Sequence, residues 1–347
     1  MGNIIWTIFF SLIVICSIVG NIAVLWVIIG NRRMWSVPNY FLANLALADL
    51  GMAMLNTMPS FIFMRDGVWQ LGSMYCSVNM FTSVLTVNAN IFTLVGLTVN
   101  RNRAILTPLA PRASSLSLVI GISFIWLLSG VAAVPSAVFS KLVTVSTKDG
   151  GKKALCLMVW PDGWQGKSSM DHHYNLFLFM INYLLPLLYM IFAYSRMGCV
   201  LNAEVIGEST SSSRMARNKK KKVVKMFALL VFLFGFCWLP YQLYFLISHY
   251  VPTIARQQYT KDMYLGFYWL AMINSCINPL IYYVWNERFR SYFDDIIMYW
   301  CPIKMRRNQE IEIELQSMAS GNINSARRII HTRMAVLPKP SETTTQC

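Results

Sequence analysis

Asp49 is the only carboxylate placed deep inside any long apolar run of the sequence. It lies about ten residues into the run 39–64, roughly 15 Å along a helix that rises about 1.5 Å per residue. Other apolar runs contain asparagines, at Asn21, Asn90, Asn274 and Asn278. A carboxylate among amide and hydroxyl oxygens suits a small hard cation. We therefore predict a sodium site whose ligands are Asp49, Asn90, Asn274 and Asn278; the alternative is a hydrogen-bonded network that holds helices together.

A second charged group, Arg101, ends the apolar run 74–100 and has an asparagine on each side, Asn100 and Asn102. No Asp or Glu occurs between Asp66 and Asp149, so this run contains no acid that could pair with the arginine. At a helix end, Arg101 can reach the polar interface while its stem packs on the bundle. It either contacts a partner at that end or only anchors the helix.

The sequence contains no nucleophile–base pair, metal-binding cluster or phosphate-binding loop, so we predict that the protein is not an enzyme. His172 and His173 are adjacent and cannot both face one site on a helix. Pumps and coupled transporters normally use several buried acids or broken helices in repeated halves. One buried acid and no repeat argue against transport, which we keep as an alternative together with a non-signalling scaffold. We expect no cofactor other than the sodium ion.

The elements that must position these groups are long and apolar. Apolar residues make up 56% of the 347 residues and charged residues only 13%, about half the usual share. A helix needs roughly 17–25 mostly apolar residues to cross the hydrocarbon of a membrane. The sequence contains seven such runs, at 4–30, 39–64, 74–100, 116–138, 174–200, 223–249 and 262–285. We predict an all-α membrane protein, a bundle of seven transmembrane helices.

The distribution of basic residues predicts the orientation of these spans. Lys and Arg concentrate in the connections after the first, third and fifth spans and after the seventh, whereas acids partly balance the few bases elsewhere. The N-terminus is therefore expected outside and the C-terminus in the cytoplasm. The net charge of +15 reflects this topology, and we expect no nucleic-acid partner, although the segment RNKKKK at 217–222 is strongly basic.

We predict one folded domain, residues 1–301, followed by a polar, disordered tail, residues 302–347. The domain ends in a short amphipathic eighth helix, because apolar residues recur at helical spacing in NERFRSYFDDIIMYWC. The outer connection 139–173 has the Gly, Lys and Ser content of turns or a short hairpin. The inner connection 201–218 has the composition of a flexible loop.

Of the eight cysteines, only Cys76 and Cys156 lie on the oxidising side of the predicted topology. A disulfide between them would tie the long outer connection over the bundle, and two free thiols are the alternative. Prolines inside the last three spans, Pro186, Pro240 and Pro279, each remove a backbone hydrogen bond and can kink a helix. Neighbouring polar groups must then satisfy the freed carbonyls. Kinked helices favour a bundle that changes shape.

Taken in order, these motifs resemble those of the rhodopsin-like G-protein-coupled receptors over about residues 12–301. The matching residues are Gly20–Asn21, LANLALADL (42–50), Cys76, NRNRAILTPL (100–109), Trp126, Pro186, FCWLPYQ (236–242) and NPLIY (278–282). Each motif alone is weak, whereas the ordered set is specific. The resemblance implies a receptor in the plasma membrane, an outside disulfide, and coupling to a heterotrimeric G protein, with arrestin and a receptor kinase as further partners.

Residues at single positions indicate which branch of this receptor family the sequence resembles. Met272 stands where opsins have the retinal-binding lysine, and Ser83 stands where amine receptors have an aspartate. CLMVWPDG, KKKKVVKMF and LAMINSCINPLIYY look like the tachykinin receptors and their neuropeptide Y and luqin-like relatives. Tachykinin receptors often have glutamate at the position of Asp49, so we predict a receptor for a neuropeptide without naming the peptide. A receptor for a lipid or other small molecule is the alternative within the family.

The resemblance also carries over site residues by position. It places a ligand cavity at Asn56, Asn79, Tyr241, Gln242, Phe245, Tyr264 and Tyr268. The cavity is expected to be apolar and aromatic with a few polar groups, although Gln242 replaces a histidine of the tachykinin group, and each aromatic residue could instead be packing between helices. The residues expected to switch conformation are Trp238, Pro240, Asn278, Pro279 and Tyr282.

At the cytoplasmic end, the resemblance assigns G-protein contact to Asn100, Arg101 and Asn102. The family motif usually reads Asp-Arg-Tyr, and its acid holds the arginine in the resting state. Asn100 supplies no charge, so we predict raised basal activity. Cys301, after the eighth helix, is expected to be palmitoylated. The sequence begins almost at the first span and has no Asn-X-Ser/Thr motif, whereas most receptors of this branch have a longer, glycosylated N-terminal segment.

Overall fold

A computed structural model describes residues 2–107, 114–146, 150–203, 211–251 and 260–300. Its contacts divide the chain into a first unit, Met1–Phe289, and a second unit, Arg290–Cys347. Three predictions fall outside the described residues: the domain boundary at residue 301, palmitoylation at Cys301 and the disordered tail 302–347.

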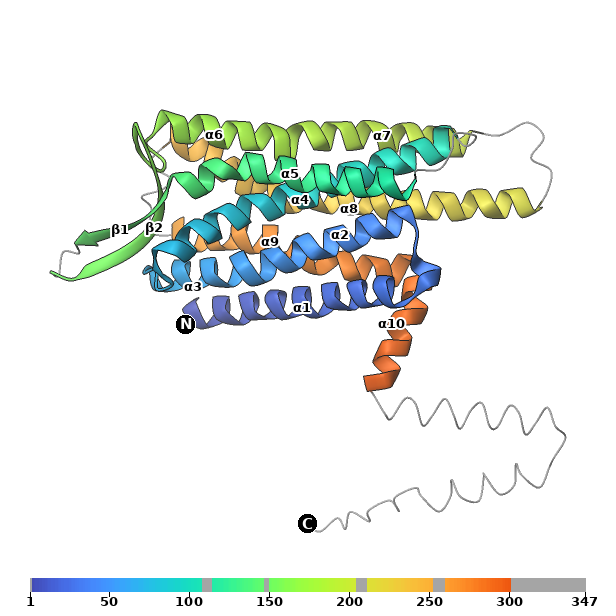
Figure 1. Ribbon diagram of the computed structural model, residues 1–347, viewed down its shortest axis with the longest axis horizontal. Coiled ribbons are helices and arrows are strands. Elements are labelled where there is room, and N and C mark those ends of the chain that lie inside the picture. Colours follow the sequence, from blue (N-terminus) through green and yellow to red (C-terminus); the bar gives the residue numbers. More distant parts are fainter. Residues whose placement is uncertain (1, 108–113, 147–149, 204–210, 252–259, 301–347) are drawn as a thin grey trace, which may run out of the picture. The chain divides into compact units, whose positions relative to one another are not determined.

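The first unit is a bundle of long helices (Figure 1). Its main helices are α1 (Gly2–Gly30), α2 (Val37–Gly51), α3 (Met58–Asp66), α4 (Gly72–Leu106), α5 (Ser115–Val138), α6 (Ser169–Phe179), α7 (Leu185–Asn202), α8 (Ser211–Tyr250) and α9 (Thr260–Trp285). A short turn η1 (Arg32–Met34) joins α1 to α2. The π-helical turns η2 (Met52–Thr57) and η3 (Met180–Leu184) join α2 to α3 and α6 to α7. Each of these pairs therefore continues as a single span, over Val37–Asp66 and Ser169–Asn202.

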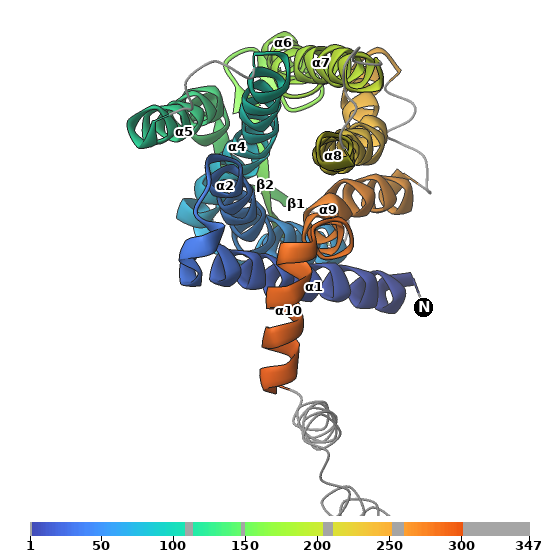
Figure 2. The ribbon, with the colours of Figure 1, turned by 90° about the vertical axis from the view of Figure 1, so that its right-hand side faces the viewer.

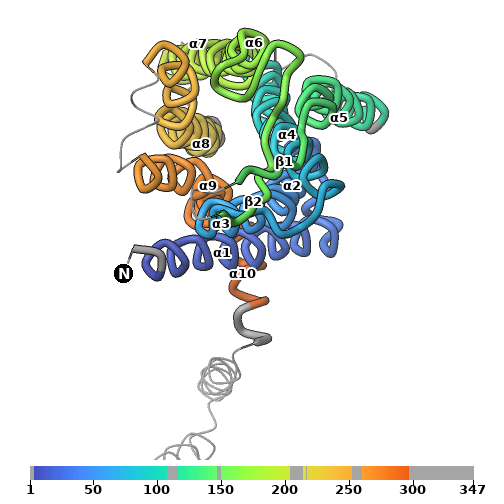
Figure 3. The backbone as a smooth tube through the Cα atoms, turned by 90° about the vertical axis from the view of Figure 1, so that its left-hand side faces the viewer, coloured from blue at the N-terminus to red at the C-terminus, as the bar shows by residue number. Residues whose placement is uncertain are grey.

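Six spans in the described part of the chain are long and apolar enough to cross a membrane, and they correspond to the first six predicted spans. The seventh predicted span corresponds to α9, a helix of 26 residues. Its lower hydropathy has a structural reason, because it buries Asn274, Ser275 and Asn278 against the other helices. It packs against α1 and α8, so the bundle closes as Figure 2 and Figure 3 show from its two ends.

Gly20 and Pro279 explain how α1 packs against α9. A Cβ atom added to Gly20 would lie 2.9 Å from Cγ of Pro279, so only glycine permits this approach. Pro279 cannot donate to the carbonyl of Ser275, four residues earlier. The side-chain amide of Asn21 donates to that carbonyl oxygen at 3.0 Å instead. The prediction that a neighbouring polar group satisfies the freed carbonyl is confirmed here.

The connection between α5 and α6 forms an antiparallel hairpin of β1 (Ser140–Ser146) and β2 (Lys152–Trp160), to which the short β3 (Gly163–Trp164) adds. This confirms the predicted hairpin. It lies at the end of the bundle where α1 begins and α3 ends, and we call this the hairpin end (Figure 1). Figure 3 looks onto this end, where the hairpin runs across the bundle.

Asp162 fixes the passage from the hairpin into α6. Its carboxylate accepts hydrogen bonds from the Ser168 hydroxyl and from the backbone N–H groups of Ser169 (2.8 Å) and Met170 (3.0 Å). These donors hold the pKa of Asp162 below its usual value, chiefly through the Ser168 hydroxyl. A carboxylate at a helix N-terminus also suits the helix dipole. The first turn of α6 is therefore tied to the hairpin.

The opposite end carries Arg101 and the lysines of α8, and we call it the basic end. One prediction for this end was wrong. The inner connection was predicted to be flexible over 201–218, whereas α8 begins at Ser211. The helix therefore continues about three turns before the apolar run 223–249 begins. Its Arg, Lys, Met and Ala residues are good helix formers, and they extend a helix already nucleated in the bundle. Residues 204–210 are not described.

The predicted eighth helix is confirmed as α10 (Glu287–Trp300), which begins in the first unit and continues into the second. Within the first unit, Phe289 is fully buried, and its ring lies 5.6 Å from that of Tyr282. The Asn286 side-chain oxygen accepts a hydrogen bond from the N–H of Arg288 at 3.1 Å, as a cap at the start of this helix.

Candidate functional site

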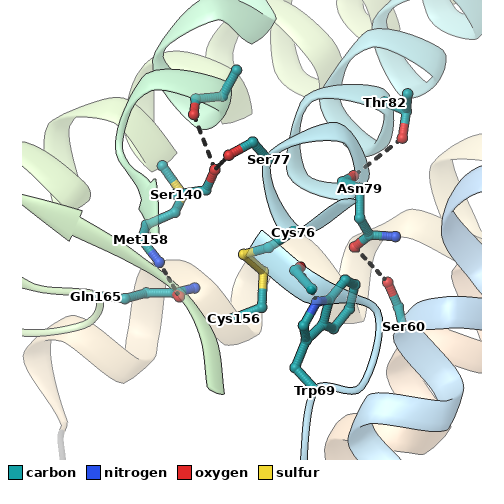
Figure 4. Close-up of a disulfide and its surroundings, with 12 residues drawn as sticks. Ser60, Trp69, Cys76, Ser77, Asn79, Thr82, Ser140, Cys156, Met158 and Gln165 are labelled. Atoms are coloured by element: carbon teal, nitrogen blue, oxygen red, sulfur yellow. Dashed lines mark hydrogen bonds between the residues drawn. A yellow bond between two sulfur atoms is a disulfide. The ribbon is translucent and has the colours of Figure 1, made fainter. Parts of the chain in front are cut away.

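A disulfide between Cys76 and Cys156 joins the hairpin to the start of α4, as predicted (Figure 4). Both cysteines are fully buried beside the Trp69 ring. Trp69 adds two hydrogen bonds, from its backbone N–H to Ala154 O (2.8 Å) and from its indole to Gly72 O (2.9 Å). The position of β2 over the bundle is therefore fixed by a covalent bond and by the loop that precedes α4.

Side chains alternate between the two faces of β2, so residues on the same face as Cys156 also point into the bundle. Side chains two residues apart share one face of a strand, so Cys156, Met158 and Trp160 all point inward and are buried. The Gln165 side chain accepts a hydrogen bond from the Met158 N–H at 3.4 Å (Figure 4). Met158 and Gln165 both line a central cavity of about 150 Å³ below the hairpin.

The central cavity combines apolar walls with uncharged polar groups. Amides and a hydroxyl from four spans line it, at Asn56, Ser83, Asn175, Asn182 and Gln242. Among the described residues that line it, none is Asp, Glu, Lys, Arg or His. A few convergent polar groups in an apolar pocket are typical of ligand sites. This cavity therefore suits an uncharged chemical group that can both donate and accept hydrogen bonds.

Five of the seven predicted ligand-site residues line this cavity, namely Asn56, Tyr241, Gln242, Phe245 and Tyr268. The Tyr268 hydroxyl donates to the Asn56 side-chain oxygen at 2.9 Å, which joins α9 to η2. The other two residues lie behind this wall. The Asn79 amide donates to Leu55 O at 3.0 Å, and the Tyr264 ring packs 6.0 Å from that of Tyr241.

Trp238 forms part of the cavity wall beneath Tyr241, at the level where Pro240 interrupts α8. Its ring contacts Tyr241 edge-on at 5.9 Å and lies 6.0 Å from the Phe234 ring. The indole N–H is buried and has no hydrogen-bond partner in the described part of the chain.

Sequence reasoning missed several residues that line the cavity. Ser83 and Met272 served only to exclude other receptor branches, although both line it. Met158 had a usable signal, because it lies two residues after the disulfide cysteine and must share its face. Gln165 follows a turn and belongs to no periodic element, so no pattern could have placed it.

At the middle of the bundle, Asp49 is fully buried, and both of its oxygens accept amide hydrogen bonds. Asn90 of α4 donates to Oδ1 at 2.6 Å, and Asn278 of α9 donates to Oδ2 at 2.8 Å. Ser275 is a further side-chain neighbour of the carboxylate, whereas Asn274 is not among its hydrogen-bond partners in the described residues. The network therefore joins α2, α4 and α9.

Two buried amide oxygens near this network have no partner among the described residues, those of Asn90 and Asn21. A carboxylate with unpaired amide oxygens has the hard-oxygen chemistry that a sodium ion requires. The amides also hold the helices together directly, because the Asn21 amide bonds the Ser275 carbonyl. The residues present thus fit a small monovalent cation as well as a structural network.

Arg101 lies at the basic end of α4, half-buried, with its guanidinium carbon 5.0 Å from the ring centroid of Phe227 on α8. This is a cation–π contact, and Phe227 is fully buried. In the described part of the chain, no acid pairs with Arg101 and its Nε has no partner. A separate ion pair joins Lys222 of α8 to Glu287 of α10 at 2.8 Å.

Two further residues of the predicted switch and coupling sets, Tyr282 and Asn102, have buried polar atoms. Tyr282 is fully buried, and its hydroxyl has no partner among the described residues. Asn102 likewise has a buried side-chain oxygen without a described partner. Thr98 donates to the Tyr194 hydroxyl at 3.3 Å, which links α4 to α7 above Arg101. The bundle therefore holds several buried polar groups that could gain partners in another arrangement of the helices.

Comparison with known proteins identifies the family. The family model of the 7 transmembrane receptor (rhodopsin family) matches residues 20–282. The tachykinin-like peptides receptor 86C of Drosophila melanogaster is 43% identical over 95% of this chain and 64% of its own length. The human neuromedin-K receptor is 34% identical over 89% of this chain and 65% of its own length.

The substance-P receptor of Meriones unguiculatus is 34% identical over 84% of this chain and 70% of its own length. The chain spans less than two thirds of the length of the Drosophila and human relatives. Aspartate at position 49, which differs from the usual tachykinin glutamate, did not separate the chain from this branch. The chain belongs to the rhodopsin family of seven-transmembrane receptors, within its tachykinin-receptor branch.

Proposed function

We propose that the protein is a receptor for an extracellular neuropeptide of the tachykinin type and that it transmits binding to a heterotrimeric G protein. The observation that carries this proposal is the central cavity, which lies under the disulfide-anchored hairpin and ends on Trp238. The names of the relatives support a peptide as the ligand, since they are receptors for tachykinin-like peptides, neuromedin K and substance P.

The form of the cavity supports insertion of one end of a peptide. Its volume of about 150 Å³ is below the roughly 300 Å³ at which small-molecule pockets begin. A second cavity of about 280 Å³ adjoins it and shares Gln165, Asn175 and Phe245. The outer cavity has acidic and basic residues in its walls, including Lys167 and Asp171, whereas the described lining of the inner cavity contains no Asp, Glu, Lys, Arg or His. An extended chain with an uncharged, amidated end matches this sequence of environments.

The proposed topology places the hairpin end outside and the basic end in the cytoplasm of a cell with this receptor in its plasma membrane. The basic residues of α8 and the connections at its end support this orientation. Arg101, flanked by Asn100 and Asn102, then faces the G protein. Arrestin and a receptor kinase are proposed partners of the same end, and palmitoylation is proposed at Cys301. Accessibility of terminal epitope tags in intact cells measures the orientation.

The experiment is to express the chain in cells and apply a panel of amidated peptides of the tachykinin, RF-amide and RY-amide types. Calcium and cyclic AMP are measured. A concentration-dependent response to one peptide supports the proposal. The matching free-acid peptide should be weaker, because the inner cavity has no Lys, Arg or His among its described lining residues to pair with a carboxylate. Responses to lipids alone would instead favour the lipid-receptor alternative. Ligand transport without any signal would favour a transporter.

A matched pair of variants tests whether the cavity is the binding site. Ser83→Phe fills it, whereas Leu188→Phe adds the same ring at an exposed position on α7. We expect Ser83→Phe to lower peptide potency at least about tenfold, equivalent to ~1.4 kcal/mol. Leu188→Phe should leave potency unchanged at equal surface density. Equal potency of both variants would place the site elsewhere.

We also propose that Asp49 binds sodium with help from Asn90 and Asn278, and that sodium weakens agonist binding. The buried carboxylate and the unpaired amide oxygen of Asn90 support the proposal. The direct readout is thermal stability of purified protein in sodium chloride and in N-methylglucamine chloride. Sodium should raise Tm of the wild type but not of Asp49→Asn. If the variant keeps both this shift and the sodium dependence of peptide affinity, the network is structural only.

A further inference from the structure

A groove of about 900 Å³ lies on the outside of α4, α5, α6 and α7, apart from the disulfide and the Asp49 network. Val95 of α4, Val131 and Pro135 of α5, Phe177 of α6 and Leu185 of α7 line it. Its volume falls within the roughly 300–1,000 Å³ of pockets for small molecules. The lining is almost entirely hydrocarbon. The groove is therefore large enough for one apolar molecule of ordinary ligand size.

The sequence explains why a groove forms at this place. On α5, Pro135 lies inside the helix and cannot donate a backbone hydrogen bond, and on the other side the π-helical turn η3 immediately precedes Leu185 and Pro186. Two of the α5 residues that line the groove, Val131 and Ala132, are small. A π-helical turn also rotates the side chains that follow it, such as Leu185, relative to a regular helix. Irregular backbones and small side chains leave space that the protein itself does not fill.

The groove opens to the surroundings of the bundle rather than to its interior. Val131 is 62% exposed and Leu185 is 58% exposed, although both belong to spans that are apolar enough to cross a membrane. In a membrane, the surroundings at this depth are lipid. The molecule that fills the groove therefore comes from the bilayer, not from water.

His173 supplies the only imidazole among the described residues of the lining. Its Nδ1 lies 2.6 Å from the carbonyl oxygen of Ser169, which can only accept, so Nδ1 carries the proton. In the neutral ring, Nε2 is then an acceptor for an O–H group. The hydroxyl of Tyr174 is already committed to Ala132 O at 2.9 Å. His173 therefore offers one acceptor at the hairpin-end mouth of an apolar groove.

The described lining contains no Lys or Arg, and this indicates which class of membrane lipid fits the groove. A phosphate or a carboxylate needs Lys or Arg nearby, and the described lining of the groove contains neither. A sterol needs no cation, because its polar part is one hydroxyl group and the rest is a rigid apolar body. We infer that this groove binds one membrane sterol, with the sterol hydroxyl donating to Nε2 of His173 and the ring system lying against Val131 and Phe177.

Tyr174 links the sterol groove to the central cavity, because its side chain forms part of both walls. One aromatic ring therefore separates the groove from the cavity. The same ring packs 5.4 Å from that of Trp160, which the hairpin holds. A sterol in the groove supports Tyr174 from behind and favours the arrangement of the cavity wall. This consequence rests on the proposed peptide-receptor function, whereas sterol binding itself does not.

The experiment uses the full chain in phosphatidylcholine nanodiscs that contain a diazirine-bearing cholesterol, followed by mapping of the labelled peptides. Label should appear on α5 and on α6–α7 at the groove, and unlabelled cholesterol should compete. Val131→Trp fills the groove and should lower this label about tenfold by steric exclusion. Leu127→Trp is the matched control, because Leu127 is 63% exposed on the same helix and does not line the groove.

A second pair tests the polar end. His173→Phe removes the acceptor and should lower labelling about two- to tenfold, the range for one lost hydrogen bond. His173→Gln keeps an acceptor and should label more strongly than His173→Phe. Equal labelling in Val131→Trp and the wild type overturns the site. More efficient labelling by a diazirine fatty acid, without competition by cholesterol, shows an acyl-chain site and overturns the sterol assignment.

The coupling is tested separately by peptide affinity with and without cholesterol. We expect cholesterol to change the affinity of the wild type and of Leu127→Trp but not of Val131→Trp. Labelling without an effect on affinity removes the coupling and leaves the site. If no peptide binds, the proposed function fails, and the labelling result still decides the sterol site.

Discussion

Asp49 and Arg101 are both ionisable side chains inside the bundle, and the structure treats them differently. Asp49, at the middle, is fully buried, and amides from two other helices donate to both of its oxygens. Arg101, at the basic end, has no acid partner in the described residues and lies against the Phe227 ring. One charge is held by directional hydrogen bonds and the other by the face of an aromatic ring.

This difference separates a structural centre from a site that can change partners. Breaking a buried hydrogen bond leaves an unsatisfied group, which costs far more than the net gain from forming the bond. A cation–π contact is less directional, and its loss leaves an arginine that can still reach water or another protein. We therefore expect the Arg101 contact to exchange partners more readily than the hydrogen bonds of the Asp49 network.

The largest expected effect comes from removing the Asp49 acceptor. Asp49→Leu leaves the amides of Asn90 and Asn278 buried without an acceptor, and each such donor costs about 1–3 kcal/mol. We expect a large fall in Tm of the purified protein and reduced surface expression. Asp49→Asn keeps one acceptor oxygen and should lose less. A Tm of Asp49→Leu equal to that of the wild type would show that the network does not stabilise the fold.

Arg101→Lys gives the next effect and separates signalling from anchoring. Lysine keeps the charge and the long stem, so a simple anchor would tolerate it, but it lacks the planar group that stacks on a ring. We expect agonist-evoked nucleotide exchange on the G protein to fall about tenfold, or ~1.4 kcal/mol. Peptide affinity should stay unchanged. Normal exchange at equal surface density would support the anchor interpretation.

The same comparison shows what the sequence could predict. Asp49, Asn90 and Asn278 were recognisable because polar residues are rare in apolar spans, and rarity marks them individually. Phe227 was not recognisable, because a phenylalanine in an apolar helix has no distinguishing pattern and its contact with Arg101 depends on the packing of α8. The Cys76–Cys156 bond followed from topology, whereas Gln165 depends on a turn outside any periodic element.

The ends of helices and the irregular turns within spans were the other features that the sequence could not predict. The sequence predicted the existence of each span, yet it did not predict the extension of α8 back to Ser211 or the π-helical turns η2 and η3. Helix ends depend on small differences in propensity that tertiary contacts override. The groove beside Pro186 depends on such an irregular turn. The spans could therefore be predicted, and the family resemblance placed most of the expected residues of the central cavity, but the groove could not be predicted.

Phe227→Leu should have a smaller effect than Arg101→Lys, and the effect should appear in basal rather than in agonist-evoked nucleotide exchange. It removes the aromatic face that Arg101 contacts, and the lost cation–π contact is worth about 0.5–2 kcal/mol. If this contact holds α4 and α8 together at rest, basal nucleotide exchange should rise several-fold. Phe10→Leu is the control for loss of packing, since Phe10 is also fully buried but lies on α1. An equal rise in both variants would assign the effect to general loosening.

The smallest expected effect tests the neutral residue before the arginine. Asn100 supplies no charge to Arg101, and the structure shows no hydrogen bond between them in the described part of the chain. Asn100→Asp introduces a carboxylate one residue away, and a charge-assisted pair is stronger than a neutral one by about 1 kcal/mol at a partly wet site. The new pair competes with Phe227 for the guanidinium and holds it in the resting arrangement. With a gap of a few kcal/mol between resting and active states, basal signalling should fall several-fold.

Peptide-evoked signalling should persist at equal surface density, because the peptide supplies the free energy that breaks the pair. High salt screens exposed pairs, so the difference from the wild type in a purified nucleotide-exchange assay should shrink as salt rises. An unchanged basal rate in Asn100→Asp would mean that the ring of Phe227, not the missing acid, determines the resting state.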